Sequence, residues 1–453
     1  MSGANSMRRG YHDLPRPEIL ALIPAESKRV LDLGCGTGMI GKALKKRQQC
    51  HVTGIELNKE ASEIAKGNID LCICDNLNRY NPSLEHVKYD CIIFGDILEH
   101  LVSPWAVIQK FSSVLADNGV IIASIPNVSH PNVLWNLKQG LFRYEPAGIL
   151  DITHLRFFTK TSIFQMFYGA GLKIVSCKSH PAENNPIQYY VTAVKPLTAH
   201  KKPTTTILIL TFNNWEYTRQ CLKSIKEKTQ SPYKIVVIDN GSTDETIREL
   251  RKDLSIYHIE NSSNLGFAKG FNVGLVCVDT PYFVLCNSDV VVTPNWLVKM
   301  TAQIETDKDL MLLGAVSNHV SGPQRVINVP YKNDTELDEF SKLRMYKEFK
   351  GLTYCPRIVF FFTLFKSEAL QRIGFLDEIF GLGNFEDDDY CMRVQKKGLK
   401  TAFDKAVFIH HYGSRGFGKD PAAFNKLLAK NGQLFLKKWK LQSYGGITKE
   451  VDL

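Results

Sequence analysis

Two groups of residues in this sequence have the types and spacing to do chemistry, and the first is a glycine-rich segment near the N-terminus. The run from Val30 to Gly38 reads VLDLGCGTG and follows a short apolar stretch. Glycines let a backbone pass close to a ligand, and the free N–H groups of a helix that begins there can bind one. Glu56 lies 24 residues after Asp32, where a carboxylate can accept both hydroxyls of a ribose. Asp75 ends the third short strand and could accept a hydrogen bond from an adenine amino group.

The second group lies in the C-terminal half, where three apolar runs each end in a polar turn. Thr211 and Asn213 follow the first run, Asp239 ends the second, and Asp289 follows the third. Ligands of open α/β sheets bind at the carboxyl ends of the strands, so these turns are expected to face one crevice. Asp239 could accept the ring N–H of a pyrimidine, although the turn at 242–245 could equally be a helix cap.

The elements that must position these residues form two alternating patterns. Residues 28–125 alternate β-branched runs (28–33, 51–57, 89–96 and 119–126) with helical patterns (39–47, 59–66 and 104–115). This alternation is typical of right-handed βαβ units that build a parallel sheet. A helix near 162–169 and an antiparallel pair, 171–179 and 188–196, are expected to close its edge. A second alternation begins at Ile207, so we predict an α/β chain with domains at 1–197 and 205–453 and a linker at 198–204.

Composition and charge exclude several classes of protein. The chain has 453 residues, of which 44% are hydrophobic and 23% charged, as in soluble globular proteins with large cores. Its net charge of +10 attracts nucleic acid, anionic lipid and phosphorylated small molecules alike. Eleven cysteines without a C-x-x-C pair indicate neither a disulfide framework nor a zinc ribbon, and they favour a reducing cytoplasm. No apolar stretch approaches the 18 residues of a membrane span, which leaves peripheral membrane contact open.

The glycine segment, Glu56 and the run Asp96-Ile97-Leu98-Glu99-His100-Leu101 resemble the class I S-adenosylmethionine-dependent methyltransferases over residues 25–195. The resemblance implies a Rossmann-like fold in which the cofactor is S-adenosylmethionine. It implies that Glu56 binds the ribose and Asp75 the adenine. The residues that it implies for the methionine end are Asp32, Gly34, Gly36 and Gly38. A dinucleotide-binding dehydrogenase also uses a glycine loop and a ribose acid, but it has no role for the Asp96–His100 run.

Methyl transfer mainly requires alignment of the acceptor with the sulfonium methyl group, because the sulfonium is already a good donor. An acceptor hydroxyl would still benefit from a base, for which His100 and His154 are the candidates. Each of these histidines could instead form hydrogen bonds in the wall of the pocket without transferring a proton. Amino-methylating nucleic-acid enzymes of this fold carry an N/D-P-P-Y-type motif where this chain has Phe94-Gly95-Asp96-Ile97. A nucleic-acid partner is therefore not expected.

The C-terminal half, over about residues 204–420, resembles family 2 glycosyltransferases of the GT-A fold. The segments that carry the resemblance are Ile207–Asn214, Val236–Asp244, Asn264–Asn272, Leu285–Asp289, Gly383–Tyr390 with Arg393, and His410–Ser414. The resemblance implies that Asp239 binds the base of a nucleotide sugar, Asp289 a metal ion, and that Asp387 deprotonates the acceptor. The other residues that we expect at the donor are Thr211, Asn213, Asn264, Gly266, Asn272 and Asn287.

A departing nucleoside diphosphate needs a hard divalent cation, Mg²⁺ or Mn²⁺, held by oxygen and imidazole ligands. Asp289 and His411 supply those types, and His410 is nearly as good a candidate. Asn287 stands in the position of the first aspartate of a D-x-D motif, so this sequence departs from the strict motif there. Glu386 is the alternative base beside Asp387. The three acids at 386, 388 and 389 could instead form a solvated helix N-terminus, where acids complement the helix dipole.

Together these features predict a two-domain enzyme of glycan assembly. It would transfer a sugar from a nucleotide-sugar donor with inversion and would methylate a glycan hydroxyl. The acceptor would be a glycan, lipid-linked or protein-linked. The alternative is a glycosyltransferase with a non-catalytic or nucleic-acid-directed methyltransferase-like domain. The donor base, the sugar and the oligomeric state are left open.

Overall fold

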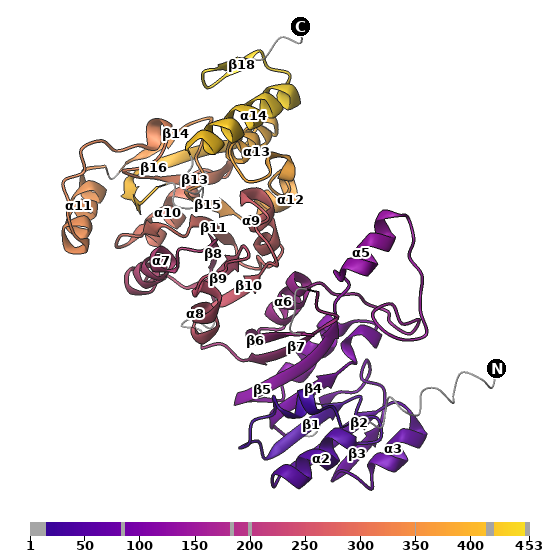
Figure 1. Cartoon of the computed structure of the whole chain (residues 1–453). Helices are drawn as coiled ribbons and strands as arrows, with labels where there is room; N and C mark the ends of the chain where they lie inside the picture. Colours follow the sequence, from indigo (N-terminus) through magenta and orange to yellow (C-terminus); the bar gives the residue numbers. More distant parts are fainter. Residues whose placement is uncertain are drawn as a thin grey trace. The chain divides into compact units, whose positions relative to one another are not determined.

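The computed structural model describes residues 15–82, 87–181, 185–197, 202–348, 350–413 and 421–448. Its contacts divide the chain into two compact units, Met1–Leu197 and Thr198–Leu453 (Figure 1). Part of the expected linker, 198–201, lies outside the described residues. No helix in the described part of the chain is long and apolar enough to cross a bilayer.

The first unit is built on a seven-stranded sheet in the order β3-β2-β1-β4-β5-β7-β6. Its strands are β1 (Arg29–Leu33), β2 (His51–Glu56), β3 (Leu71–Cys74), β4 (Tyr89–Gly95), β5 (Leu115–Pro126), β6 (Lys173–His180) and β7 (Gln188–Val194). Strands β1 to β5 are parallel, and β7 runs antiparallel between β5 and β6. This is the parallel sheet with an antiparallel edge pair that the sequence predicts.

Helices flank this sheet because its strands are apolar along most of their length. The helices are α1 (Pro17–Leu20), α2 (Met39–Arg47), α3 (Lys59–Ala65), η2 (Leu98–His100), α4 (Pro104–Ser112), α5 (Pro131–Lys138) and α6 (Lys160–Gly169). Strand β1 is buried at four of its five positions, which requires cover on both faces. Helix α3 packs on β2 and β3, and α6 packs on β6.

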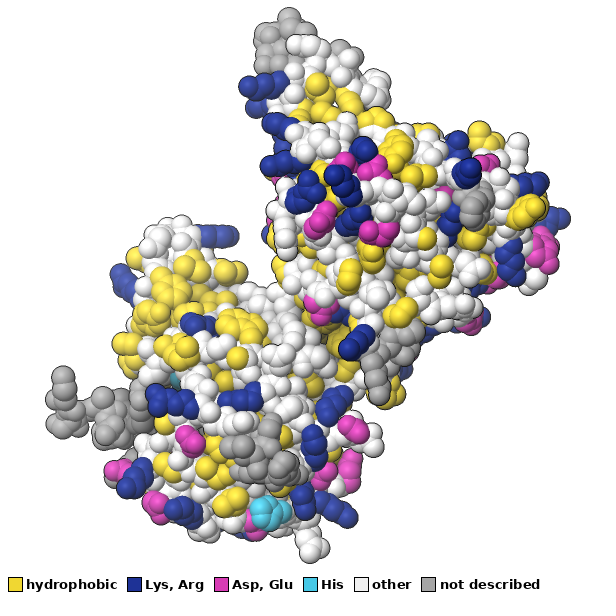
Figure 2. Space-filling model, turned by 180° about the vertical axis from the view of Figure 1, so that it is seen from behind, with side chains coloured by type: hydrophobic (Ala, Val, Ile, Leu, Met, Phe, Trp, Pro, Cys, Tyr) yellow, Lys and Arg dark blue, Asp and Glu magenta, His cyan; other side chains and the backbone are white. Residues whose placement is uncertain are grey.

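Helix α5 and the segment after it were not predicted, because their apolar side chains point outward rather than into a core. The exposed side chains there include Trp135, Leu137, Leu141, Phe142 and Tyr144. Figure 2 shows hydrophobic side chains gathered on the projecting part of this unit that carries α5.

The second unit is built on an eight-stranded sheet in the order β10-β9-β8-β11-β15-β13-β16-β14. Its strands are β8 (Thr205–Thr211), β9 (Tyr233–Asp239), β10 (Tyr257–Glu260), β11 (Tyr282–Asn287), β13 (Leu310–Val316), β14 (Leu352–Tyr354), β15 (Phe362–Lys366) and β16 (Lys400–Phe408). Strands β8 to β11 are parallel, and β15 runs antiparallel between β11 and β13. Two small ladders join β12 (Val290–Val291) to β17 (His410–His411) and β18 (Ser443–Tyr444) to β19 (Ile447–Thr448).

The helices of this unit are α7 (Trp215–Lys228), α8 (Thr246–Lys252), α9 (Phe267–Leu275), α10 (Trp296–Ile304), η3 (Gly322–Gln324), α11 (Asp334–Lys347), α12 (Glu368–Arg372), η4 (Glu378–Phe380), α13 (Glu386–Lys396) and α14 (Pro421–Trp439). Helix α9 packs on β8 and β9, while α10 packs on β13 and β16. The core between these layers is formed by apolar side chains such as Ile207, Val237, Trp296 and Leu313.

Gly266, at the start of α9, approaches the backbone of the loop after η4. Its φ is +81°, and a Cβ atom there would collide with the backbone oxygen of Gly381. We expect Gly266→Ala to lower the free energy of unfolding by about 3 kcal/mol, because the collision adds to the strain of a left-handed alanine. Gly374→Ala is the matched control, since Gly374 has a φ of +94° but nothing near its Cβ position.

Urea unfolding of the full chain, followed by tryptophan fluorescence, measures both changes. The control should lose only about 1 kcal/mol. Equal losses in the two variants would contradict the close approach at Gly266.

Candidate functional site

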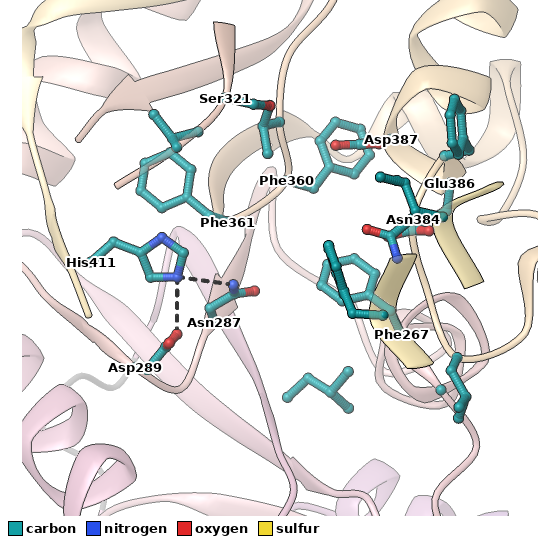
Figure 3. Close-up of a pocket in the computed structure, with 18 of the residues that line it drawn as sticks. Phe267, Asn287, Asp289, Ser321, Phe360, Phe361, Asn384, Glu386, Asp387 and His411 are labelled. Carbon is teal, nitrogen blue, oxygen red and sulfur yellow. Dashed lines mark hydrogen bonds and ion pairs between the residues drawn. The ribbon is translucent and has the colours of Figure 1, made fainter. Parts of the chain in front are cut away.

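A cavity of about 1340 Å³ opens at the carboxyl ends of β8, β9 and β11. Eight of the residues that the sequence analysis expects at the site line this cavity: Thr211, Asn264, Gly266, Asn287, Asp289, Glu386, Asp387 and His411. Figure 3 shows Asp289 and His411 on one side of the cavity and Glu386 and Asp387 on the other. The structure therefore brings together residues up to 200 positions apart in the chain.

The two-stranded ladder of β12 and β17 positions Asp289 and His411. It pairs Val290 with His411, and Tyr412 N donates to the backbone oxygen of Asp289 at 2.9 Å. Both side chains are buried, and His411 Nε2 lies 3.1 Å from Asp289 Oδ1. His411 Nδ1 lies 2.6 Å from the backbone oxygen of His319. A carbonyl oxygen only accepts, so Nδ1 carries a proton and Nε2 is the ring nitrogen that faces Asp289.

This pair fits a divalent cation. Two ligand atoms that lie about 2.1 Å from a cation at right angles are about 3.0 Å apart, close to the 3.1 Å between Asp289 Oδ1 and His411 Nε2. The backbone oxygen that fixes the ring tautomer is typical of histidines that bind metal ions. Asn287 Nδ2 also lies 3.4 Å from His411 Nε2. The side chain at the first position of the D-x-D motif, here an asparagine, therefore lies beside the Asp289–His411 pair.

His410 is directed away from the cavity. Its Nδ1 lies 2.6 Å from the hydroxyl oxygen of Tyr331, and it does not line the cavity. Burial lowers the pKa of His410. Of the two adjacent histidines, the geometry favours His411 as the ligand.

Asp239 and Asn213 hold the turns after β8 and β9 together instead of lining the cavity. Asp239 is fully buried, and its carboxylate accepts from the backbone N–H groups of Gly241 and Ser242 at 3.1–3.3 Å. Burial raises the pKa of Asp239 to about 6. Asn213 Oδ1 accepts from Thr243 N at 2.8 Å, and Asn213 N donates to Ser242 Oγ at 2.7 Å. The residue after Asp239, Asn240, lines the cavity in its place.

Asn264 and Asn272 have different positions, although both belong to one sequence motif. Asn264 lines the cavity, and its Oδ1 accepts from Asn240 Nδ2 and from Gly266 N at 2.9 Å each. Asn272 instead exchanges hydrogen bonds with the backbone of Leu376 at 2.9 and 3.0 Å. Its amide therefore joins α9 to the loop before η4, outside the cavity lining.

The alternative of a solvated helix N-terminus at 386, 388 and 389 is wrong, because all four acids at the start of α13 are buried. Arg357 Nε donates to Asp388 Oδ1 at 2.5 Å, and Tyr444 donates to the same oxygen at 2.9 Å. Asp389 accepts from Arg393 at 2.9 Å and from Trp439 at 3.0 Å. Asp388 and Asp389 thus have charged or polar partners within the unit. Glu386, Asp387 and Asp388 line the cavity, and Asp389 does not.

Asp387 and Glu386 have raised pKa values. Burial is the main cause for both, and neighbouring carboxylates add to it. The pKa of Glu386 rises to about 7. Asp387 Oδ1 accepts from Asp388 N at 2.8 Å, whereas Glu386 Oε2 has no hydrogen-bond partner within the described part of the chain. Each acid is therefore a stronger base than a solvent-exposed carboxylate.

The first unit places its expected ligands at the carboxyl ends of β1 and β2. Gly34, Gly36 and Gly38 all have positive φ values, and Gly36 N donates to Glu56 Oε2 at 2.8 Å. Asp32 is buried, which together with the nearby Glu56 raises its pKa to about 7. Asp75 is exposed and accepts from Asn76 N at 2.6 Å.

His100 and His154 lie side by side near the carboxyl end of β4. Their ring centroids are 4.8 Å apart, with the rings near perpendicular. Glu99, which the sequence analysis did not select as a site residue, lies beside them and is buried. Burial raises the pKa of Glu99 to about 8.

Family models match both units. Residues 7–177 match the model described as "Methyltransferase domain", and residues 206–374 match "Glycosyl transferase family 2". The chain joins a methyltransferase domain to a family 2 glycosyltransferase domain.

Individual relatives match only parts of this two-domain chain. An uncharacterized glycosyltransferase of Haemophilus influenzae is 30% identical over 117 residues, 25% of this chain and 36% of that protein. A ubiquinone biosynthesis O-methyltransferase of Aeromonas salmonicida is 27% identical over 154 residues, 32% of this chain and 63% of that protein. The match thus spans less than two thirds of either relative. The mannosyltransferase PcManGT from Pyrobaculum calidifontis, solved with GDP-Man and Mn²⁺, aligns at 19% identity over 53% of this chain and 65% of that chain, with a TM-score of 0.39.

The glycosyltransferase cavity also contains residues that sequence analysis missed. They include His319, Arg325, Arg357, Phe360, Phe361 and Tyr444. Phe361 stacks on His411 at 5.2 Å between ring centroids. Among the described residues, the cavity lining has four carboxylates, at 289, 386, 387 and 388, and two guanidinium groups, one of which is paired with Asp388. A diphosphate would need further positive charge to bind there.

Proposed function

We propose that the chain is a bifunctional enzyme of glycan assembly. Its glycosyltransferase domain would transfer a sugar from a nucleotide-sugar donor with inversion, and its methyltransferase domain would methylate a glycan hydroxyl with S-adenosylmethionine. The observation that carries the proposal is the cavity in which the Asp289–His411 pair faces Asp387 (Figure 3). One side of such a cavity would hold the cation and the leaving group, and the opposite side would hold the catalytic base.

In this proposal Asp289 Oδ1 and His411 Nε2 would hold Mg²⁺ or Mn²⁺, which supplies positive charge to the departing diphosphate. The backbone oxygen of His319 keeps the His411 lone pair directed at that position. Asn264 and Gly266, fixed by Asn240, shape the same cavity wall for the donor. Asp239 would stabilise the turn after β9 that borders the donor site. Alternatively, this turn would open, and Asp239 would bind the base of the donor directly.

Asp387 would accept the proton of the acceptor hydroxyl. The hydroxyl oxygen then bonds to the sugar carbon as the bond from that carbon to the diphosphate oxygen breaks, in one displacement that inverts the carbon. The raised pKa of Asp387 strengthens it as a base. Asp388 cannot share this role, because Arg357 and Tyr444 occupy its Oδ1.

In the methyltransferase domain, the loop at Gly34, Gly36 and Gly38 would pass close to S-adenosylmethionine, with Asp32 at its methionine end. Glu56 would accept the ribose hydroxyls, and the exposed Asp75 would reach the adenine. The match of this region to a methyltransferase family model supports these roles. Methylation of a hydroxyl fits the O-methyltransferase names of several relatives.

The direct test is to incubate the full chain with a panel of nucleotide sugars and Mn²⁺ and to measure released nucleoside diphosphate. The proposal predicts release from at least one donor, and it predicts loss of that release when the cation is removed with EDTA. Release that persists in EDTA would contradict the cation site. No release from any donor, with glycan acceptors present, would contradict the transferase role.

Glu56→Gln is expected to weaken S-adenosylmethionine binding by about 5- to 150-fold. The amide removes a charged acceptor, whose hydrogen bonds to the ribose contribute about 1–3 kcal/mol. Because Glu56 also accepts from the backbone of Gly36 and Asn58, the isosteric glutamine disturbs the loop less than alanine would. Calorimetry on the full chain measures the affinity, with the exposed Glu145→Gln as control. Unchanged affinity in Glu56→Gln would remove this residue from the cofactor site.

A further inference from the structure

We propose that Glu99, His100 and His154 of the methyltransferase domain form a binding site for a first-row divalent cation. This site would be additional to the Asp289–His411 pair of the glycosyltransferase domain. The three residues offer one carboxylate oxygen and two imidazole nitrogens, and these atoms all lie within 4.8 Å of one another. Such a donor set suits Mn²⁺, Co²⁺ or Zn²⁺ better than Mg²⁺ or Ca²⁺, which prefer oxygen ligands.

Glu99 is the observation that separates this cluster from an ordinary group of polar side chains. It is only 1% exposed, and its Oε2 has no hydrogen-bond partner among the described residues. A buried carboxylate oxygen without a hydrogen-bond partner loses its hydration without compensation at that atom. A cation between Glu99 and the two histidines would supply that compensation.

The two histidines present the nitrogen atoms that a cation needs. His154 Nδ1 lies 2.9 Å from the backbone oxygen of Ile149, and His100 Nδ1 lies 3.2 Å from that of Thr153. Each Nδ1 must carry the proton to donate to a carbonyl oxygen, so the neutral rings keep their lone pairs on Nε2. A backbone oxygen behind each ring is the usual arrangement for histidine ligands of metal ions.

Backbone hydrogen bonds hold the two contributing segments together. The backbone oxygen of Glu99 accepts from Leu155 N at 2.8 Å and from Arg156 N at 3.0 Å. The segment that carries His154 is thereby tied to η2, which carries Glu99 and His100. Tetrahedral ligands of one cation lie about 3.4 Å apart, so ligand atoms that are now within 4.8 Å of one another need to approach by up to about 1.4 Å.

The cluster lies at the edge of the sheet where the cofactor loop begins. Strand β4, which precedes η2, pairs with β1, which precedes the glycine loop. A Cβ atom at Gly34 would lie 2.8 Å from the Ile97 side chain, two residues before Glu99. If the proposed function holds, the open positions of the cation would bind the acceptor hydroxyl. The oxygen would bond to the methyl carbon as the carbon–sulfur bond breaks, and its proton, made more acidic by the cation, would leave to water. His100 and His154 would then be ligands and not bases.

The test measures cation binding to the full chain, so that it does not depend on any transfer activity. Protein stripped with EDTA is titrated with Mn²⁺, and free Mn²⁺ is followed by electron paramagnetic resonance. The Asp289→Ala background removes the glycosyltransferase pair, and one Mn²⁺ per chain is expected to remain. In that background, Glu99→Gln and His154→Gln should each weaken binding by about 100-fold or more. Glu145→Gln, an exposed acid of the same domain, should leave it unchanged.

A second readout identifies the ligands. Co²⁺ bound to the Asp289→Ala chain should show a visible absorption spectrum that His154→Gln alters, with far-ultraviolet circular dichroism confirming that the variants remain folded. The absence of a bound cation in Asp289→Ala would overturn the proposal, as would binding that Glu99→Gln leaves unchanged. A chain that binds Mn²⁺ at this site but transfers no methyl group would contradict the proposed function and not the site.

Discussion

Asp387→Asn is expected to retain donor binding and to lose sugar transfer by about 10² to 10⁴, the usual contribution of a positioned base. Asparagine preserves the shape of the side chain and can still accept from Asp388 N, the hydrogen bond that holds Asp387 Oδ1 at 2.8 Å. It cannot accept the acceptor proton. Transfer is measured as product formation at saturating donor and cation, and donor binding is measured by calorimetry.

Glu386→Gln is the matched comparison, because Glu386 is the adjacent buried acid of the same cavity. We expect it to affect transfer less than Asp387→Asn does. Normal turnover in Asp387→Asn with an inactive Glu386→Gln would show that the base is one residue earlier than proposed.

The pH dependence of transfer follows from the same residue. Burial, with the charges of Asp388 and Glu386, raises the pKa of Asp387 above its ordinary value. Because the ionised form is the base, transfer should fall as the pH falls through this raised pKa. The acid limb of kcat/KM should therefore lie well above pH 4, the range in which an exposed aspartate titrates. A profile that is flat down to that range would contradict a buried carboxylate as the base.

Asp289→Ala should weaken Mn²⁺-dependent donor binding by about 10- to 150-fold. The change removes a charged ligand whose interactions contribute about 1.5–3 kcal/mol. His411→Gln should act in the same direction, because Asp289 Oδ1 and His411 Nε2 form one pair. The measurement is donor affinity by calorimetry with Mn²⁺ and with EDTA.

His410→Gln is the control for this pair. His410 is the neighbouring histidine in the chain, and its Nδ1 contacts the hydroxyl oxygen of Tyr331 and not Asp289. Donor affinity in this variant should keep its dependence on Mn²⁺. If His410→Gln abolished the dependence and His411→Gln did not, the ligand assignment would be reversed.

The sequence predicted the parts of the fold whose residues alternate in a regular pattern. The parallel strands β1 to β5 and β8 to β11 combine buried apolar runs with polar turns, and these turns contain most of the expected site residues. It did not predict β13, β15 and β16, which are also apolar but follow no βαβ order. The antiparallel insertion of β15 between β11 and β13 depends on long-range packing that no local pattern contains.

Sequence motifs located most of the expected residues that line the cavity, whereas lining residues outside any motif were missed. Arg357 precedes β15 in a segment without a recognisable pattern, and only the structure shows that it neutralises Asp388. The burial of all four acids of α13 was also missed, because an acidic helix start usually lies in solvent. Asn272 shows the opposite error: its motif suggested a ligand contact, but its amide is engaged by Leu376.

One measurement tests the bifunctional account most directly. The full chain is incubated with a nucleotide sugar that it turns over, with isotopically labelled S-adenosylmethionine and with a glycan acceptor, and the products are analysed by mass spectrometry. The account predicts a single glycan that carries both the new sugar and the label, with the label appearing only after the sugar, because two sites on one chain keep the product of one near the other. Label on the free nucleotide sugar before it appears on glycan would contradict it.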